Sequence, residues 1–326
     1  MRARSLSVGL VLFIGCTASP ADEVRPAEAP IINGMRTTGQ PWVVAVARTG
    51  TMGGLCTGTA IGDYAVLTAK HCVFEETSPG RWSAVLPHQL IVVVGYDVTR
   101  AAGIERTIVG TEVRTTPGSN VDSDIENGND VAVILLSSDL GVPTRAISRA
   151  APVRGTPVTI TGFGRTIPGT PMESDAGVKH TGTARVGRVF TRLVESTGTS
   201  WTCQGDSGGG LISMDSNRIL GVTSFGPGGC TFSNSFYSRA DIHLALINDA
   251  LRFVPPCDPL PETCGDSIDN DCDGEEDEGC TPLGEPCSTP DECSGGACED
   301  VGGSMLCVRE CDPRAAIPMC PFGFYC

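Results

Sequence analysis

The chain of 326 residues contains, at positions 203–210, the segment Cys203-Gln204-Gly205-Asp206-Ser207-Gly208-Gly209-Gly210. A serine hydroxyl is a poor nucleophile at neutral pH, so a serine that transfers acyl groups must lie beside a base and face backbone N–H groups that hold the developing negative charge. Glycines permit the sharp turn that this presentation needs, and they leave the N–H groups of Gly205 and Ser207 uncovered. An ordinary glycine-serine turn has a similar composition, so the interpretation depends on partners elsewhere in the chain.

Two such partners precede this segment. A histidine follows an apolar, strand-like run in Val66-Leu67-Thr68-Ala69-Lys70-His71-Cys72, and Asp130 stands at the start of a second apolar run, residues 131–136. Taken singly, a lone histidine is usually structural and an aspartate before a strand is usually a turn residue. The order His71, Asp130, Ser207, together with these flanks, resembles the chymotrypsin/trypsin-like serine proteases.

This resemblance implies a catalytic triad. His71 is expected to accept the Ser207 proton and return it to the leaving amine, while Asp130 holds the imidazole in the correct tautomer. The N–H groups of Gly205 and Ser207 are expected to form the oxyanion hole. Three further histidines lack such flanks and are interpreted as structural or exposed: His88, His180 and His243.

The same resemblance places the mature N-terminus at Ile31, in Ile31-Ile32-Asn33-Gly34. In the family, the ammonium group freed by cleavage turns inward and pairs with the aspartate before the nucleophile, here Asp206. A buried carboxylate without a partner is costly, which makes this ion pair an effective switch. The residue before the cut is Pro30, where most relatives carry Arg or Lys. We therefore expect either an activating protease of different specificity or a chain that works without the switch.

Trp201 occupies the position at the base of the primary specificity pocket, if the spacing back from Ser207 is kept. Relatives that cleave after Arg or Lys have an aspartate there, and an indole cannot pair with a cation as a carboxylate does. With Gly226 and Ser235 as small walls, the predicted preference is for a small or medium apolar substrate residue. The resemblance also assigns Ser224 a hydrogen bond to Asp130. The full set of residues expected to contact the substrate is Trp201, Thr202, Ser224, Phe225, Gly226 and Ser235.

The resemblance further implies two disulfides. Cys56 and Cys72 are expected to bracket the histidine, and Cys203 and Cys230 to join the nucleophile loop to the pocket wall. Cysteine spacing by itself does not determine connectivity.

The composition, with 41 glycines and many short β-branched runs, indicates an all-β protein of more than one domain. For residues 31–254 the resemblance implies a serine protease domain of two six-stranded antiparallel β-barrels with the active site between them. A short C-terminal helix is expected over residues 241–253, where apolar residues recur at helical spacing. The candidate strands are 42–48, 90–98, 107–115, 131–137, 157–162, 184–194 and 218–225.

Residues 1–21 have the pattern of an export signal. Arg2 and Arg4 precede the apolar run 6–15, which is too short to span a membrane as a mature helix. Phe13-Ile14-Gly15-Cys16 resembles a bacterial lipobox, in which the cysteine receives a lipid. The alternative is ordinary secretion with cleavage after Ala18 or Ala21. Residues 22–30 then form a propeptide or linker.

Residues 255–326 form an acidic, cysteine-rich tail. Positions 257–326 hold 11 of the 16 cysteines and 17 acidic residues against two arginines, which accounts for the net charge of −15. The preceding part is balanced, so nothing in it favours nucleic acid. Such cysteine density indicates an oxidising compartment and a small disulfide-stapled module. Eleven is an odd number, so these cysteines cannot all pair with one another. One thiol is therefore free or paired with another chain, or the sequence is incomplete at its C-terminus.

The segment 262–280 resembles a short metal-binding-type module of exported proteins from myxobacteria and their relatives. Asp269, Asp271 and Asp273, followed by Gly274, have the alternating carboxylates of a calcium loop. The position of the bidentate glutamate is taken by Cys280, which excludes a complete helix–loop–helix site. Calcium bound in a stapled loop and a merely solvated acidic run both stay open.

Residues 287–326 look like an extracellular cysteine-rich module for adhesion, spacing or docking to a surface or partner. Zinc is the rival interpretation, but paired Cys-x2-Cys spacings are missing.

These observations predict an exported serine endopeptidase, secreted or held at a bacterial cell surface. It would cleave proteins or peptides through an acyl-enzyme and need no cofactor for catalysis. Membrane attachment would come only from a lipid on Cys16. The alternative is a non-catalytic binding or adhesion protein of the same fold that acts through its tail.

Overall fold

The computed structural model describes residues 31–49, 54–167, 176–227, 230–231, 234–255, 264, 279–293 and 297–308. The predicted export signal with Cys16, the 22–30 segment, and Asp269, Asp271 and Asp273 lie outside the described residues. Within the described part of the chain, no helix is long and apolar enough to cross a membrane.

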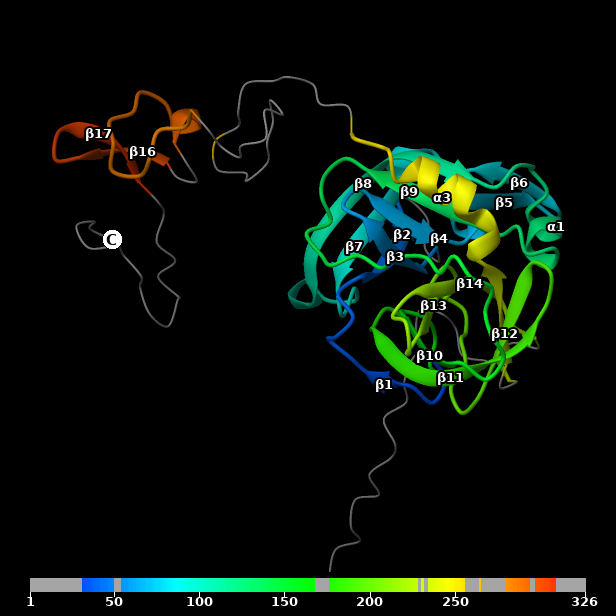
Figure 1. Cartoon of the computed structure of the whole chain (residues 1–326). Coiled ribbons are helices and arrows are strands. Elements are labelled where there is room, and N and C mark those ends of the chain that lie inside the picture. The colour runs from blue at the N-terminus through cyan, green and yellow to red at the C-terminus, as the bar shows by residue number, and fades with distance from the viewer. Residues whose placement is uncertain are drawn as a thin grey trace, which may run out of the picture.

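Six antiparallel strands close into a first barrel in the order β2-β3-β4-β9-β8-β7 (Figure 1). All five residues of β9 are buried, as its continuous apolar run indicates. It pairs with β4 on one side and β8 on the other, and helix α3 contacts it as well. The bounds are β2 Val43–Arg48, β3 Cys56–Gly62, β4 Ala65–Thr68, β7 Leu90–Gly95, β8 Ile104–Thr115 and β9 Ala132–Leu136.

A second closed barrel follows, with the strand order β11-β10-β13-β14-β15-β12 and a further β11–β12 pairing. The short strand β1 (Met35–Arg36) adds to it by pairing with β11. Its core includes Ile31, Val158, Leu211 and Tyr237, all fully buried. The bounds are β10 Pro157–Gly162, β11 His180–Val189, β12 Leu193–Thr197, β13 Gly210–Ser213, β14 Ile219–Phe225 and β15 Asn234–Arg239. The expectation of an all-β fold with two six-stranded barrels is confirmed.

Short helices and a hairpin complete the domain. Helix α1 (Val121–Glu126) precedes Asp130, and the hairpin β5–β6 follows the histidine turn η1 (Lys70–Val73). The C-terminal helix α3 (Leu244–Ala250) packs against β8 and β9 of the first barrel (Figure 1). The remaining elements are β5 Phe74–Ser78, β6 Arg81–Ala84, and the 3-10 helices η2 Pro87–Gln89, η3 Ala101–Gly103 and η5 Asp241–His243.

Two predicted elements were wrong in detail. The run 184–194 is not one strand, because the chain turns at residues 190–192 and the hairpin β11–β12 spans it. The predicted helix 241–253 is split into η5 and α3, which bury Ile247 and Ala250 while Ile242 is exposed. Several barrel strands were not predicted at all, since their short glycine- and serine-containing sequences, as in β13, carry little periodicity.

In the tail, the structure describes a small module built around disulfides. The hairpin β16 (Ala297–Val301) and β17 (Ser304–Val308) follows the 3-10 helix η6 (Pro290–Glu292), and four half-cystines form its core. Cys287 pairs with Cys298 and Cys293 with Cys307, while Cys264 pairs with Cys280 and so staples the ends of the acidic segment. These bonds replace the apolar core that so short a segment cannot build.

Candidate active site

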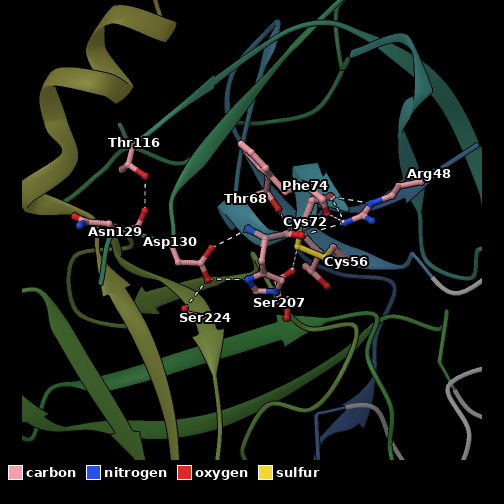
Figure 2. A network of polar contacts seen from close by, with 12 residues as sticks. Arg48, Cys56, Thr68, Cys72, Phe74, Thr116, Asn129, Asp130, Ser207 and Ser224 are labelled. Atoms are coloured by element: carbon pink, nitrogen blue, oxygen red, sulfur yellow. Dashed lines mark hydrogen bonds and ion pairs between the residues drawn. A yellow bond between two sulfur atoms is a disulfide. The ribbon is translucent and has the colours of Figure 1, made fainter. Parts of the chain in front are cut away.

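The three expected catalytic residues come from both barrels. His71 lies in the turn η1 that follows β4, and Asp130 lies just before β9, which pairs with β4. Ser207 precedes β13 of the second barrel. Because β4 and β9 are neighbours, their adjoining ends bring His71 and Asp130 together, and Ser207 belongs to the same network (Figure 2).

Asp130 is fully buried and holds His71 through two contacts. The His71 backbone N–H donates to Oδ1 at 2.9 Å, and His71 Nδ1 lies 2.7 Å from Oδ2. The Ser224 hydroxyl donates to the same Oδ2 at 2.5 Å (Figure 2). Burial acts to raise the pKa of Asp130, but the charge and hydrogen bonds of His71 and the bond from Ser224 outweigh it and lower that pKa. Asp130 therefore stays ionised and can stabilise an imidazolium.

Ser207 is half-buried and stands on a rigidly held turn. Its carbonyl accepts a 2.8 Å bond from the Thr57 N–H, and the next residue, Gly208, has a φ of +87°. A Cβ on Gly208 would lie 2.2 Å from the Thr57 carbonyl oxygen, so this position requires glycine. Among the hydrogen bonds of the described residues, none joins Ser207 Oγ to His71 Nε2. In proteases without substrate this contact is often long and tightens on binding.

Thr57 anchors the nucleophile loop, and sequence reasoning missed it. Besides its N–H bond to Ser207, its hydroxyl donates to the Gly205 carbonyl at 2.8 Å, and it accepts from the Phe163 N–H at 3.1 Å. Gly205 has a φ of +94°, another conformation that favours glycine. Thr57 directly follows Cys56, which the resemblance places beside the histidine, and this position is the signal that could have identified it.

The Asp206 carboxylate is buried among backbone N–H groups. It accepts backbone N–H bonds from Cys203 and Gly164, each at 2.8 Å, and from Ile31. Burial raises the pKa of Asp206 to about 7, although these three bonds act to lower it. Ile31 is itself fully buried and has a φ of +54°, which is strained for a β-branched residue. Ile31 and Asp206 are thus already in contact.

Hydrogen bonds fix several of the residues that the resemblance assigns to the specificity pocket. The Trp201 indole N–H donates to the Cys230 carbonyl at 2.8 Å, and its ring packs against Ile32 and the Cys203–Cys230 disulfide. The Thr202 N–H donates to Ser235 Oγ at 3.0 Å. The hydroxyls of Thr202, Ser235 and Ser196 gather around the phenol of Tyr237, whose pKa burial raises.

The strip expected to line the substrate backbone continues from Ser224. The Phe225 ring stacks on Phe236 with the ring centroids 4.8 Å apart, and Gly226 is exposed. Of the other histidines, His180 and His243 are buried and His88 is exposed. Burial lowers the pKa of His180 to about 4 and also lowers that of His243, so both are neutral near pH 7.

The cysteines near the site are joined as the resemblance implies, Cys56 to Cys72 and Cys203 to Cys230. Cys56, Cys72 and His71 lie close enough together to suggest a metal site. The sulfurs are bonded to each other, however, and metal coordination by cysteine requires a thiolate. This cluster therefore does not fit a metal ion.

Comparison with known proteins identifies the family. A family model described as Trypsin matches residues 31–247, which is more than half of the chain. The chain belongs to the trypsin family. It is similar to trypsin alpha-4 of Lucilia cuprina, with 28% identity over 72% of this chain and 93% of that protein. It is also similar to serine protease SP24D of Anopheles gambiae, with 29% identity over 75% of this chain and 93% of that protein.

Solved structures show the same fold at lower identity. Neuropsin, a serine protease of mouse brain, matches with a TM-score of 0.54 and 21% identity over 68% of this chain and all of that chain. A Glu endopeptidase matches with a TM-score of 0.53 and 22% identity over 68% of this chain and all of that chain. The trypsin-family domain makes this protein a serine endopeptidase that hydrolyses protein or peptide substrates without a cofactor. Its disulfides indicate an oxidising compartment.

Proposed function

We propose that Ser207, His71 and Asp130 carry out the hydrolysis through an acyl-enzyme. Ser207 Oγ attacks the substrate carbonyl as His71 takes its proton, and the resulting imidazolium gives that proton to the leaving amine. Water then repeats the sequence to release the acid product. The proposal is supported chiefly by the 2.7 Å contact between His71 Nδ1 and the buried, ionised Asp130, because it leaves Nε2 as the nitrogen that can act as base.

The N–H groups of Gly205 and Ser207 are proposed to hold the oxyanion. Gly205 and Gly208 both have a positive φ, a conformation that glycine adopts readily and that gives this loop its sharp turn. Thr57 holds the carbonyls of these same two residues, Gly205 and Ser207, and so restrains the loop on which the N–H groups lie. Donors held in place before the reaction need no reorganisation in the transition state.

Activation is proposed to follow cleavage between Pro30 and Ile31. Cleavage converts the Ile31 N–H into an ammonium beside Asp206, which supplies the counter-charge that this buried carboxyl lacks. It also removes the peptide bond that defines the strained φ of Ile31. The proline makes a trypsin-like activator unsuitable. In this proposal the domain boundaries are 1–21, 22–30, 31–254 and 255–326.

The substrate preference is proposed to be a small or medium apolar residue before the scissile bond. The floor residue Trp201 is uncharged and held by its bond to Cys230, so it can neither pair with a cation nor move aside easily. Thr202, Ser235 and Gly226 provide small walls. Strict preference for Arg or Lys is therefore disfavoured.

The protein is proposed to be exported, either secreted or held at a bacterial surface by a lipid on Cys16. The paired cysteines and the resemblance of residues 262–280 to modules of exported myxobacterial proteins support export. The tail would dock the protease to a surface or partner. Asp269, Asp271 and Asp273 would bind calcium, held in a loop whose ends the Cys264–Cys280 disulfide joins.

A second candidate, a non-catalytic binding protein, has one observation in its favour. Pro30 precedes Ile31, where most relatives carry the Arg or Lys of the activation site. A solved structure of a mutant of human heparin binding protein shares the fold, with a TM-score of 0.56 and 20% identity.

A quenched-peptide library, incubated with the processed chain and with Ser207→Ala, separates the two. We expect cleavage after small or medium apolar residues by the wild type alone. A profile dominated by Arg or Lys would overturn the specificity proposal, and no Ser207-dependent cleavage would overturn the enzymatic one.

A further inference from the structure

The chain contains only two lysines against 21 arginines, and both lysines are buried. One of them, Lys70, directly precedes His71. On an exposed surface either residue supplies a positive charge, but a buried site distinguishes the compact ammonium from the planar guanidinium. We propose that Lys70 is a positioning residue that fixes His71 against Asp130, which rests on the catalytic roles proposed above.

The Lys70 ammonium is held by three oxygen atoms from a single segment. Nζ donates to the carbonyls of Thr116 and Gly118, each at 2.9 Å, and forms an ion pair with Asp124 Oδ2 at 2.7 Å. An ammonium has three N–H donors, so these acceptors satisfy all of them. The Lys70 side chain is completely buried, and the Phe74 ring centroid lies 5.5 Å from Nζ.

The segment that Lys70 holds also holds Asp130. Thr116 donates through its hydroxyl to the Asn129 carbonyl and through its N–H to the Val131 carbonyl at 3.2 Å (Figure 2 shows the first contact). The Asp124 carbonyl accepts from the Asn129 N–H at 2.8 Å. The residues on both sides of Asp130 are therefore tied to the partners of Lys70.

Together these bonds form a closed ring. It runs from Asp130 through its two contacts to His71, along the backbone to Lys70, through the ammonium to Thr116 and Asp124, and back to Asp130 through its neighbours. A closed ring resists changes in the His71–Asp130 distance more than one side-chain contact does. Lys70 is the member that joins the histidine turn to the aspartate segment.

Arg48 also restrains the turn η1, but it contacts other atoms than Lys70 does. Its guanidinium donates to the carbonyls of His71, Cys72 and Phe74 (Figure 2), which connects the turn to β2. These contacts restrain the turn but do not include the 116–131 segment. The alignment of His71 with Asp130 therefore depends on Lys70 in particular.

The test replaces the buried ion pair by apolar side chains in Lys70→Met/Asp124→Leu. Such replacements are often neutral or stabilising for folding, whereas removing one partner leaves an unpaired buried charge. Lys179→Met is the matched control, because Lys179 is equally buried but donates to the Gln40 carbonyl at 3.3 Å and touches neither His71 nor Asp130. Lys70→Arg keeps the charge without the ammonium geometry.

Two readouts apply to the processed full chain. The rate of Ser207 modification by a fluorophosphonate reports the base without depending on specificity, and the downfield proton NMR signal of His71 Nδ1–H reports its bond to Asp130. We expect the pair variant to react about 10 to 100 times more slowly, to lose the downfield signal, and to keep the wild-type unfolding midpoint. Lys70→Arg should also react slowly, and Lys179→Met at the wild-type rate.

A pair variant with the wild-type rate and signal would overturn the inference, as would an equal loss of rate in Lys179→Met. A wild-type chain that does not react at all would instead overturn the proposed function. In that case the proton signal, which requires no catalysis, still decides whether Lys70 positions His71.

Discussion

Asp206→Asn should abolish a pH dependence of stability that the buried carboxyl creates in the uncleaved chain. Asp206 accepts three backbone N–H bonds but has no cationic partner among the described residues, and burial raises its pKa from 3.8 to about 7. As the pH rises above 4, the unfolded chain releases this proton while the folded chain keeps it. The free energy of unfolding therefore falls with pH until the folded chain also ionises near pH 7.

The magnitude follows from the two pKa values. A difference of about three units corresponds to about 4 kcal/mol in total, of which about 2.5 kcal/mol falls between pH 5 and pH 8. Asparagine cannot ionise, so Asp206→Asn should remove this contribution and leave that of all other groups. After cleavage the Ile31 ammonium supplies the missing charge, and the same substitution should then destabilise the chain.

The assay is urea unfolding of the uncleaved chain at pH 5, 6, 7 and 8, in a Ser207→Ala background that prevents self-cleavage. Asp97→Asn is the matched control, because Asp97 is also buried but its hydrogen bonds to Thr99 and Arg100 outweigh burial and lower its pKa. Asp97 is ionised in both states across this range, so its removal should leave the slope unchanged. Equal slopes for Asp206→Asn and its parent would refute the reasoning.

Three further predictions concern the supports of the site. Gly208→Ala should lower the free energy of unfolding by about 2–4 kcal/mol, because the new Cβ would lie 2.2 Å from the Thr57 carbonyl oxygen in a backbone conformation with φ +87°. Urea unfolding measures this loss, and an unchanged midpoint would contradict the geometry. Ser224→Ala should lower kcat/KM about tenfold through loss of the O–H donor to Asp130, whereas unaltered kinetics would show that this donor is dispensable. Replacing Cys203 and Cys230 by serine should lower stability by about 3 kcal/mol, since their disulfide closes a loop of 27 residues, and a smaller loss in calorimetry would argue against that estimate.

The sequence, through its resemblance to a known family, was sufficient to predict the fold class. It also proposed His71, Asp130 and Ser207 as the site, and the structure joins the first two by hydrogen bonds. Ser207 is recognisable because glycines and an aspartate surround it, and Asp130 because a buried strand follows it. Each of these signals comes from a few neighbouring residues. The order His71, Asp130, Ser207 along the chain combines them into one family pattern. The prediction of a hydrogen bond between Ser224 and Asp130 came from the same resemblance, and the structure shows that bond at 2.5 Å.

The supports of the site were much harder to predict, because they depend on contacts between distant segments. Thr57 and Gly205 are 148 positions apart, and Lys70 meets Thr116 across 46 positions. The hairpin at 190–192 was missed for another reason. The run 184–194 is rich in β-branched and polar residues that suit a strand, and neither glycine nor proline marks its turn.

The most direct test of the central claim is the position of the covalent adduct after reaction of the processed chain with a fluorophosphonate. Peptide mass spectrometry should find one adduct per chain, on Ser207, and His71→Ala should abolish it while leaving the protein folded. An adduct on another residue, or equal modification of Ser207 in His71→Ala, would contradict the proposal that Ser207 is the nucleophile and His71 its base.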